Sequence, residues 1–242
     1  LGTGEKQAAS ALVRLRRTHR MFSPFPGLYF PVPPEYRTWG ALPATYFIDS
    51  MMRAAQRSYY VAFLSAAELH GAAHQRPQVF QVMVNRRLHD RDFARVRVRF
   101  YQDKNLVQKR TVDMNSAVGH VRVSTPEITA LDLASNLDAG GGLSNVATVL
   151  TELADDHTLD ISQLASDADH YPIAVVRRIG WLLDTIARIH DLQIETEVLL
   201  AALRARSGAS RSGTLAVPSG ARRGHTDSRW DVVENAPVEI DL

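Results

Sequence analysis

The spacing of apolar residues predicts a helix near the start of the chain and a short hairpin directly after it. Over residues 5–20, apolar side chains recur at the three-to-four-residue step of an amphipathic helix; they are Ala8, Ala9, Leu12, Val13 and Leu15. Two strand-like pieces, 21–23 and 27–32, flank a proline-rich turn at 24–27. A helix followed by a hairpin is typical of the second half of a winged helix-turn-helix. Three prolines then end this segment near residue 35; they are Pro31, Pro33 and Pro34.

Helical and alternating patterns succeed each other along the rest of the chain and predict a mixed α+β fold. Helical spacing predicts two helices, at about 44–55 and 60–70, and alternation of apolar and polar residues predicts strands around 80–84, 96–100 and 121–123. Ser124 and Glu127 have the spacing of a capping box and predict the start of the next helix. That helix carries Ile128, Leu131 and Leu133 and is expected to end before residue 140. Further helices are expected at about 143–153, 161–168, 173–189 and 195–206.

These patterns divide the chain into two predicted domains. We expect a partial winged helix-turn-helix at residues 1–37 and a mixed α/β C-terminal domain at 38–242. A stretch rich in Ser, Gly and Arg predicts a flexible segment at about 207–228, and residues 230–242 are apolar enough to dock as a short terminal strand. The sequence starts at Leu1, already in helix-like sequence, so we expect that a further segment precedes it.

Composition narrows the class of protein. An apolar share of 45% and a charged share of 22% are ordinary for a globular chain and argue against a disordered protein or a coiled-coil rod. With no Cys, the sequence offers no disulfide, thiolate nucleophile or cysteine zinc site. No apolar stretch has the length of a membrane span, and no signal peptide is recognisable. We therefore expect a cytoplasmic protein without a membrane partner.

The net charge of +2 conceals a strong segregation of charge along the chain. Residues 1–37 hold six basic and two acidic residues, and residues 86–110 hold nine basic and three acidic residues. Residues 124–170 hold nine acidic residues and no Lys or Arg. Such blocks indicate a surface that faces a polyanion in the first half of the chain and an acidic flank in the second, although solvated faces explain either block equally well.

Two sets of residues are candidates for DNA contacts. On the first predicted helix, Lys6, Gln7 and Ser10 are expected to contact bases, and the following cations are expected to contact phosphates: Arg14, Arg17 and Arg20. Three further arginines, Arg95, Arg97 and Arg99, are predicted to share one face of a strand and to form a second electrostatic site. An acidic segment of the same protein is the competing partner for that second set.

Signals for other chemistry are weak. His70 and His74 have the spacing of a two-histidine zinc site, but the HExxH pattern and a third ligand are missing. The glycines at 140–142 lack the Lys-Ser/Thr that a phosphate-binding P-loop requires. The carboxylate pairs Asp155/Asp156 and Asp167/Asp169 are predicted to be solvated. The sequence thus predicts no catalytic residue, no metal and no cofactor, and it favours a protein that is not an enzyme.

The order of several short motifs resembles the AbiEi-type antitoxins of type IV toxin–antitoxin pairs. The central motifs are Tyr59-Tyr60-Val61, Leu64-Ser65-Ala66-Ala67, Leu69-His70-Gly71, His74-Gln75, Arg97-Val98-Arg99-Phe100, Val121-Arg122-Val123-Ser124-Thr125-Pro126-Glu127 and Thr129-Ala130-Leu131-Asp132-Leu133. The likeness continues through Gly141-Gly142-Leu143, Asn145-Val146-Ala147, Arg178-Ile179-Gly180-Trp181-Leu182-Leu183 and Arg229-Trp230. Upstream, Ala11-Leu12, Arg14-Leu15 and Gly27-Leu28-Tyr29 are similar to the recognition helix and wing of that family.

The resemblance implies a repressor and antitoxin in one chain. Such proteins bind inverted repeats in their own promoter through an N-terminal winged helix-turn-helix, and their C-terminal domain opposes an AbiEii-type nucleotidyltransferase toxin, generally without a stable complex. Here the first helices of the winged domain are missing from the sequence. Two alternatives stay open. One is an interaction protein that does not bind DNA and neutralises a basic toxin through its acidic 124–170 region, and the other is an enzyme that reverses the toxin's modification.

Overall fold

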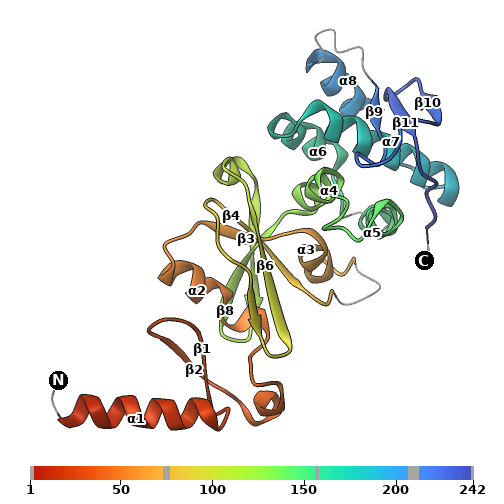
Figure 1. Cartoon of the computed structure of the whole chain (residues 1–242). Coiled ribbons are helices and arrows are strands. Elements are labelled where there is room, and N and C mark those ends of the chain that lie inside the picture. The colour runs from red at the N-terminus through yellow and green to blue at the C-terminus, as the bar shows by residue number, and fades with distance from the viewer. Residues whose placement is uncertain (1–2, 73–76, 156–157, 207–212, 241–242) are drawn as a thin grey trace. The chain divides into compact units, whose positions relative to one another are not determined.

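The computed structural model describes residues 3–72, 77–155, 158–206 and 213–240, and the chain folds into two compact units (Figure 1). Unit 1 comprises residues 1–61, 78–107 and 113–122, and unit 2 comprises residues 62–77, 108–112 and 123–242. The mixture of helices and strands confirms the predicted α+β class. Residues 1–37 belong to the same compact unit as most of a sheet, and the domain boundary near residue 37 stays a prediction.

Unit 1 begins with the helix and the hairpin that the apolar pattern predicts. Helix α1 (Thr3–Arg17) leads into strands β1 (Met21–Phe25) and β2 (Leu28–Pro31), which pair antiparallel. Gly27 stands in the turn between them with φ +79°, a conformation that glycine adopts without steric cost. Two short 3₁₀ helices, η1 (Pro34–Trp39) and η2 (Ala44–Tyr46), then connect the hairpin to α2 (Ile48–Ala54).

A six-stranded sheet follows in the order β5-β6-β4-β3-β8-β7. Its strands are β3 (Tyr59–Val61), β4 (Phe80–Val84), β5 (Arg91–Phe93), β6 (Val96–Gln102), β7 (Thr111–Ser116) and β8 (Gly119–Ser124). Strand β6 runs parallel to β4, while β3 pairs antiparallel with β4 and β5 pairs antiparallel with β6. Val82, Val84 and Val98 are fully buried, so the central strands are covered by side chains of the core.

In the first half of the chain, two predictions about local structure are wrong in detail, and two strands were not predicted. The helix expected from residue 60 begins later, as α3 (Phe63–Leu69), because the three residues before Ala62 form the buried strand β3. Strands β5 and β7 were not predicted: the three residues of β5 show no alternation, whereas β7 does alternate, with Val112 and Met114 between polar residues, and this signal was missed. On α1, Ala8, Ala9 and Val13 are exposed, so only part of the expected apolar stripe is covered.

Unit 2 is mainly helical and is organised around helix α7. Its helices after α3 are α4 (Pro126–Ser135), α5 (Leu143–Asp155), α6 (Ile161–Asp167), the 3₁₀ helix η4 (Ala168–His170), α7 (Ile173–His190) and α8 (Glu197–Arg206). Helix α7 packs against α4, α5 and α8. Helix α4 is buried on every side from Glu127 to Ala134, which places it in the core of the unit.

Helix α4 begins at a different cap from the predicted one. The Oγ1 atom of Thr125 accepts a hydrogen bond from the backbone N–H of Ile128, which makes Thr125 the N-cap. The hydroxyl of Ser124 is buried and lies 2.7 Å from that of Thr129. The predicted capping box between Ser124 and Glu127 is therefore wrong by one residue, and Glu127 is left to bind elsewhere.

The C-terminal segment closes over α7. Strands β9 (Thr214–Leu215), β10 (His225–Asp227) and β11 (Val232–Glu234) form a small sheet in the order β10-β11-β9. This sheet contains the predicted terminal strand, and it also takes up residues within 213–228 that were expected to be flexible; residues 207–212 lie outside the described part of the chain. Trp230, only 1% exposed, covers Gly180 of α7, and its indole N–H donates to Asp184 Oδ2 at 2.6 Å.

Candidate nucleic-acid interface and polar network

The predicted reading face of α1 is open to solvent. Gln7, Ser10, Arg14 and Arg17 are all exposed on this helix, and Arg20 is exposed just beyond it. The side chain of Lys6 lies outside the described residues. Exposure on one helix is what contact with a partner's bases and phosphates requires, so the geometry is compatible with the predicted roles.

The end of α1 is fixed by backbone hydrogen bonds. The N–H of Arg20 donates to the carbonyl of Leu15 at 2.8 Å, and the N–H of His19 donates to that of Arg16 at 3.1 Å, which is the Schellman pattern of a helix terminus. His19 takes the left-handed conformation with φ 52°, and its Nδ1 lies 3.2 Å from the carbonyl oxygen of Arg37. The C-terminal turn of α1 is thereby held against η1.

The hairpin is held on the sheet of the same unit by aromatic packing. Phe22 of β1 lies with its ring centroid 5.0 Å from Phe47 and 5.2 Å from Phe93 of β5. Phe47 and Phe93 also contact each other edge to face at 5.5 Å. Because these three rings come from three segments, they fix the hairpin relative to β5.

The second electrostatic site differs from its prediction. Arg95 lies in the turn between β5 and β6, so the three arginines do not share one strand face. Arg97 is exposed and stands directly opposite Asp92 in the register of the two strands. Arg99 donates to Asp92 Oδ1 at 2.6 Å and lies 3.5 Å from Asp90 Oδ2. The side-chain hydrogen bond from Arg99 lowers the pKa of Asp92, which stays charged and offsets part of the positive field.

The end of α1 and the β5–β6 turn meet at one glycine. Gly40 has φ +67°, and a Cβ at this position would lie 3.4 Å from Ala94 Cβ and 3.6 Å from His19 Cε1. Ala94 directly precedes Arg95, and His19 directly precedes Arg20. Two basic segments that lie far apart in the sequence are therefore neighbours in unit 1.

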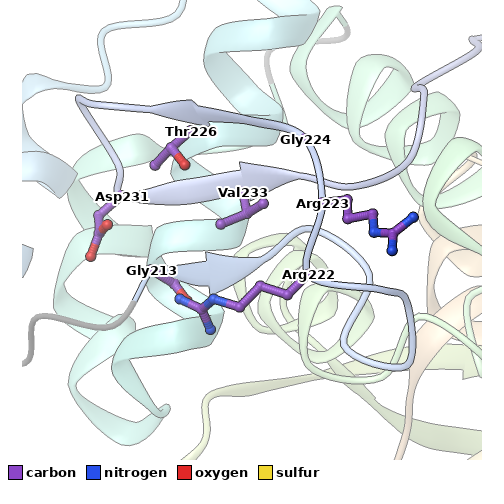
Figure 2. A pocket seen from close by; sticks show the side chains of 7 residues that line it. All are labelled: Gly213, Arg222, Arg223, Gly224, Thr226, Asp231 and Val233. Carbon is purple, nitrogen blue, oxygen red and sulfur yellow. The ribbon is translucent and has the colours of Figure 1, made fainter.

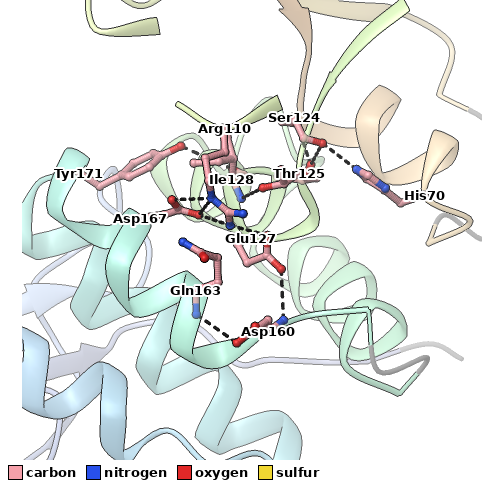
Figure 3. A network of polar contacts seen from close by, with 11 residues as sticks. His70, Arg110, Ser124, Thr125, Glu127, Ile128, Asp160, Gln163, Asp167 and Tyr171 are labelled. Carbon is pink, nitrogen blue, oxygen red and sulfur yellow. Dashed lines mark hydrogen bonds and ion pairs between the residues drawn. The ribbon is translucent and has the colours of Figure 1, made fainter. Parts of the chain in front are cut away.

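In unit 2, Asp167, which was predicted to be solvated, and Glu127 both bind a basic side chain of the same unit (Figure 3). Arg110 donates from Nε and Nη2 to Asp167, with a shortest distance of 2.7 Å, and from Nη2 to Glu127 Oε2 at 2.9 Å. The Asp167 and Glu127 side chains are each only 6% exposed. The hydrogen bond to Asp167 raises the pKa of Arg110. The prediction of a solvated Asp167/Asp169 pair is wrong for Asp167, because its buried carboxylate forms a bidentate ion pair with Arg110.

A second ion pair is sealed inside the same unit. Lys109 Nζ lies 3.1 Å from Asp132 Oδ1 and 3.9 Å from the ring centroid of Tyr171. The hydroxyl of Tyr171 donates to the same carboxylate at 2.7 Å. Asp132 is fully buried, so its charge is balanced by a neighbouring cation rather than by water. The sequence analysis did not identify Lys109 and Arg110 as partners of these acids. Their position could have indicated it, because they end the basic stretch 86–110, and the acidic stretch 124–170 follows.

His70 has a structural partner. Its Nε2 lies 2.7 Å from the carbonyl oxygen of Ser124, which accepts the hydrogen bond, and burial lowers the pKa of His70. His74, the second half of the weighed zinc pair, lies outside the described residues. Across the residues that the structure describes, no group of three or more His, Asp or Glu side chains is arranged to hold a metal ion. None of the described helices has the length and apolar character needed to cross a bilayer.

Comparison with known proteins defines the class of this chain. The model of the AbiEi antitoxin C-terminal domain matches residues 60–185, which is more than half of the 242 residues. The chain therefore belongs to the AbiEi antitoxin family, as its motifs predicted. The structure is similar to the crystal structure of the RV2827C protein from Mycobacterium tuberculosis, with a TM-score of 0.65 and 19% identity over 93% of this chain and 78% of that chain. At this identity the likeness shows a shared fold alone. None of the curated proteins matches the chain.

Proposed function

We propose that this antitoxin binds the DNA of its own promoter as a transcriptional autorepressor and counteracts an AbiEii-type nucleotidyltransferase toxin. Membership of the AbiEi family supports the antitoxin role. The observation that carries the DNA-binding proposal is the meeting of two basic segments at Gly40, where the end of α1 adjoins the β5–β6 turn. The proposal places the protein in the cytoplasm with its promoter and assigns it no catalytic step.

The proposed contacts are of two kinds, contacts to base edges and contacts to phosphates. Helix α1 and the β1–β2 hairpin would act as the recognition helix and wing of a partial winged helix-turn-helix. Lys6, Gln7 and Ser10 would contact base edges, and Arg14, Arg17 and Arg20 would contact phosphates. Arg95 and Arg97 would extend the phosphate contacts, whereas Arg99 contributes less because it already binds Asp92 and Asp90.

The alternative function receives less support from the same structure. A protein that neutralises a basic toxin through residues 124–170 would present the acidic side chains of that region at the surface. Glu127, Asp132 and Asp167 instead lie buried in ion pairs with Lys109 and Arg110. The exposed acids that are described in this region are Asp138, Asp155, Asp160 and Asp169, which is a smaller charge than the sequence suggested.

A salt-dependent DNA titration tests the proposal. The full chain is titrated by fluorescence anisotropy against duplex DNA from its own promoter and against a scrambled duplex, over a series of salt concentrations. We expect preference for the promoter and a steep salt dependence, because each phosphate contact releases counterions. The double variant Arg14→Ala/Arg17→Ala should reduce the slope of log K against log salt by about 1 for each arginine that binds a phosphate.

The matched control removes the same charge elsewhere. Arg188→Ala/Arg204→Ala changes two exposed arginines on α7 and α8 in unit 2 and should leave the slope unchanged. Equal slopes for the two double variants would contradict the assignment of α1. No preference for the promoter over the scrambled duplex would overturn autorepression, and toxin capture through the exposed acids, measured by co-purification with the toxin, would then become the better explanation.

A further inference from the structure

Two cavities of about 350 Å³ each share Gly213 in their walls, beside the small sheet of unit 2. The first is lined by residues of the segment before β10 and of the sheet itself, and Figure 2 shows Arg222 reaching from its loop toward Gly213 while Arg223 extends away from it. The second is lined by the first turns of α7 and by β9. A side chain on Gly213 would lie 3.1 Å from Asp231 Oδ1, so the absence of one keeps this junction open.

Charge around Gly213 is positive in excess. Arg177 Nη1 lies 3.0 Å from Asp231 Oδ2, so these two residues balance each other. Arg222 Nη2 donates to the carbonyl oxygen of Gly213 at 3.1 Å, and a carbonyl does not neutralise a guanidinium. Asp231 is the only carboxylate among the residues lining either cavity in the described part of the chain.

Arg178 adds a buried positive charge without a carboxylate partner among the described residues. The residue is only 4% exposed. Its guanidinium donates to the backbone carbonyls of Ala216 at 2.9 Å, Ala134 at 2.7 Å and Leu215 at 3.1 Å. Burial lowers the pKa of Arg178, but an arginine stays protonated in proteins. These carbonyls accept from three of the five N–H groups of the guanidinium and leave its charge in place, which favours an anion in the adjoining cavity.

The second cavity also offers an apolar wall. Ile173, Leu215 and Pro218 line it together with the two adjacent arginines of α7. A ligand pocket of this kind combines apolar surface with a few fixed polar groups and has a volume of about 300–1,000 Å³. The arginines suit a phosphate group, and the apolar residues suit the flat face of a base.

We propose that these cavities bind a nucleoside phosphate. Its phosphate lies near Gly213, between Arg222 and the two arginines of α7, and its base packs against Ile173, Leu215 and Pro218. This site is separate from the DNA surface of unit 1 and does not depend on the proposed repressor activity. A free nucleotide and the terminal nucleotide of a nucleic acid present the same chemistry.

Calorimetric titration of the full chain tests this site. AMP, ATP, inorganic phosphate and adenosine are titrated separately into the native protein and into the variants Arg222→Ala and Arg188→Ala. Arg222 is exposed, so its removal leaves the core intact, and Arg188 is an exposed arginine at the far end of α7 with the same charge. We expect binding of the nucleotides, weaker binding of phosphate and none of adenosine. Arg222→Ala should weaken AMP binding about tenfold, as expected for one charge-assisted hydrogen bond.

The outcomes separate the possibilities. No heat of binding with AMP or ATP, equal binding of adenosine and AMP, or an equal effect of the two variants would overturn the site. A Gly213→Val variant, which fills the junction, should abolish AMP binding while its circular dichroism spectrum stays native. A 5′-phosphorylated oligonucleotide that displaces AMP, when the same oligonucleotide without its phosphate does not, would support the site and identify a nucleic-acid end as its source.

Discussion

At the scale of single residues, charged side chains of the family domain pair inside it. Asp132 binds both Lys109 and Tyr171, and Arg110 binds Glu127 and Asp167, each through short contacts between buried or half-buried groups. Removing one partner of a buried pair leaves the other charge without compensation, which costs far more than the pair itself contributes. Glu127, Asp132 and Asp167 are therefore expected to matter for the stability of the domain.

Asp132→Ala should lower the free energy of unfolding by about 3–5 kcal/mol, because the buried Lys109 would lose the counter-charge of Asp132. Urea denaturation followed by circular dichroism measures this change. Asp138→Ala, which alters an exposed acid a few residues away, should change stability by less than about 0.5 kcal/mol. Adding Lys109→Met to Asp132→Ala should restore part of the loss. If the double variant were as unstable as the sum of the two single variants, the charges would not be coupled.

His70 gives the protein a pH dependence of known sign. Burial lowers its pKa in the folded state below the ordinary value of 6.5, so the unfolded chain binds the proton more readily. The stability that neutral His70 provides is present above pH 6.5 and is lost as the pH falls through 6.5 toward the lowered value. Comparing urea denaturation at pH 7.5 and 5.5, His70→Gln should lose less stability on acidification than the native protein. An equal loss in both would show that carboxylates alone govern this range.

At the scale of elements, the sequence predicts what repeats locally and misses what depends on partners far along the chain. The helices α5, α6 and α7 lie close to their predicted bounds, because in each of them several apolar residues recur at helical spacing. Strand β3 was not predicted, because its three residues are all buried and show no alternation of apolar and polar positions. The spacing of Arg95 fits a strand, but the β5–β6 turn, formed around Ala94 with φ 51°, intervenes.

The pairing of β5 with β6 places an acidic residue beside the arginines of this hairpin. Asp92 lies opposite Arg97 and binds Arg99, so it weakens the positive field of this hairpin. If the hairpin faces DNA as proposed, Asp92→Asn should raise promoter affinity about two- to fivefold in the anisotropy assay at fixed salt, in the range expected for one exposed charge. Asp138→Asn in unit 2 removes the same charge and should leave affinity unchanged. A rise of equal size in both variants would indicate a general charge effect instead.

At the scale of the whole molecule, the family match covers residues 60–185, but the core of unit 2 needs residues beyond it. Trp230 packs over Gly180, and a Cβ at Gly180 would overlap the indole ring. Arg229 reinforces this packing by binding Asp184 at 2.9 Å and Glu197 at 2.8 Å. The sequence placed the glycine in a helix and the tryptophan in a terminal segment, and only the fold reveals that the first makes room for the second.

The effect of Gly180→Ala should therefore depend on Trp230. In the native protein, the added methyl group should cost about 1–3 kcal/mol through overpacking. In a Trp230→Ala background, the same change should stabilise the protein by about 0.5–1 kcal/mol, because alanine is the better helix former. Thermal and urea denaturation of the four proteins measure this double-mutant cycle. A destabilisation of the same size in both backgrounds would contradict the packing described for this pair.

The packing of Trp230 on Gly180 also sets an order of events during synthesis. The ribosome completes α7 well before it adds Trp230, and until then the apolar surface around Gly180 has no cover from its own chain. Domains fold as units as they emerge, so unit 2 reaches its final packing only after translation of the C-terminal segment. A messenger truncated before the codon for Trp230 would yield a chain with this surface exposed to proteases, and the cell would hold less antitoxin than its translation initiation rate implies.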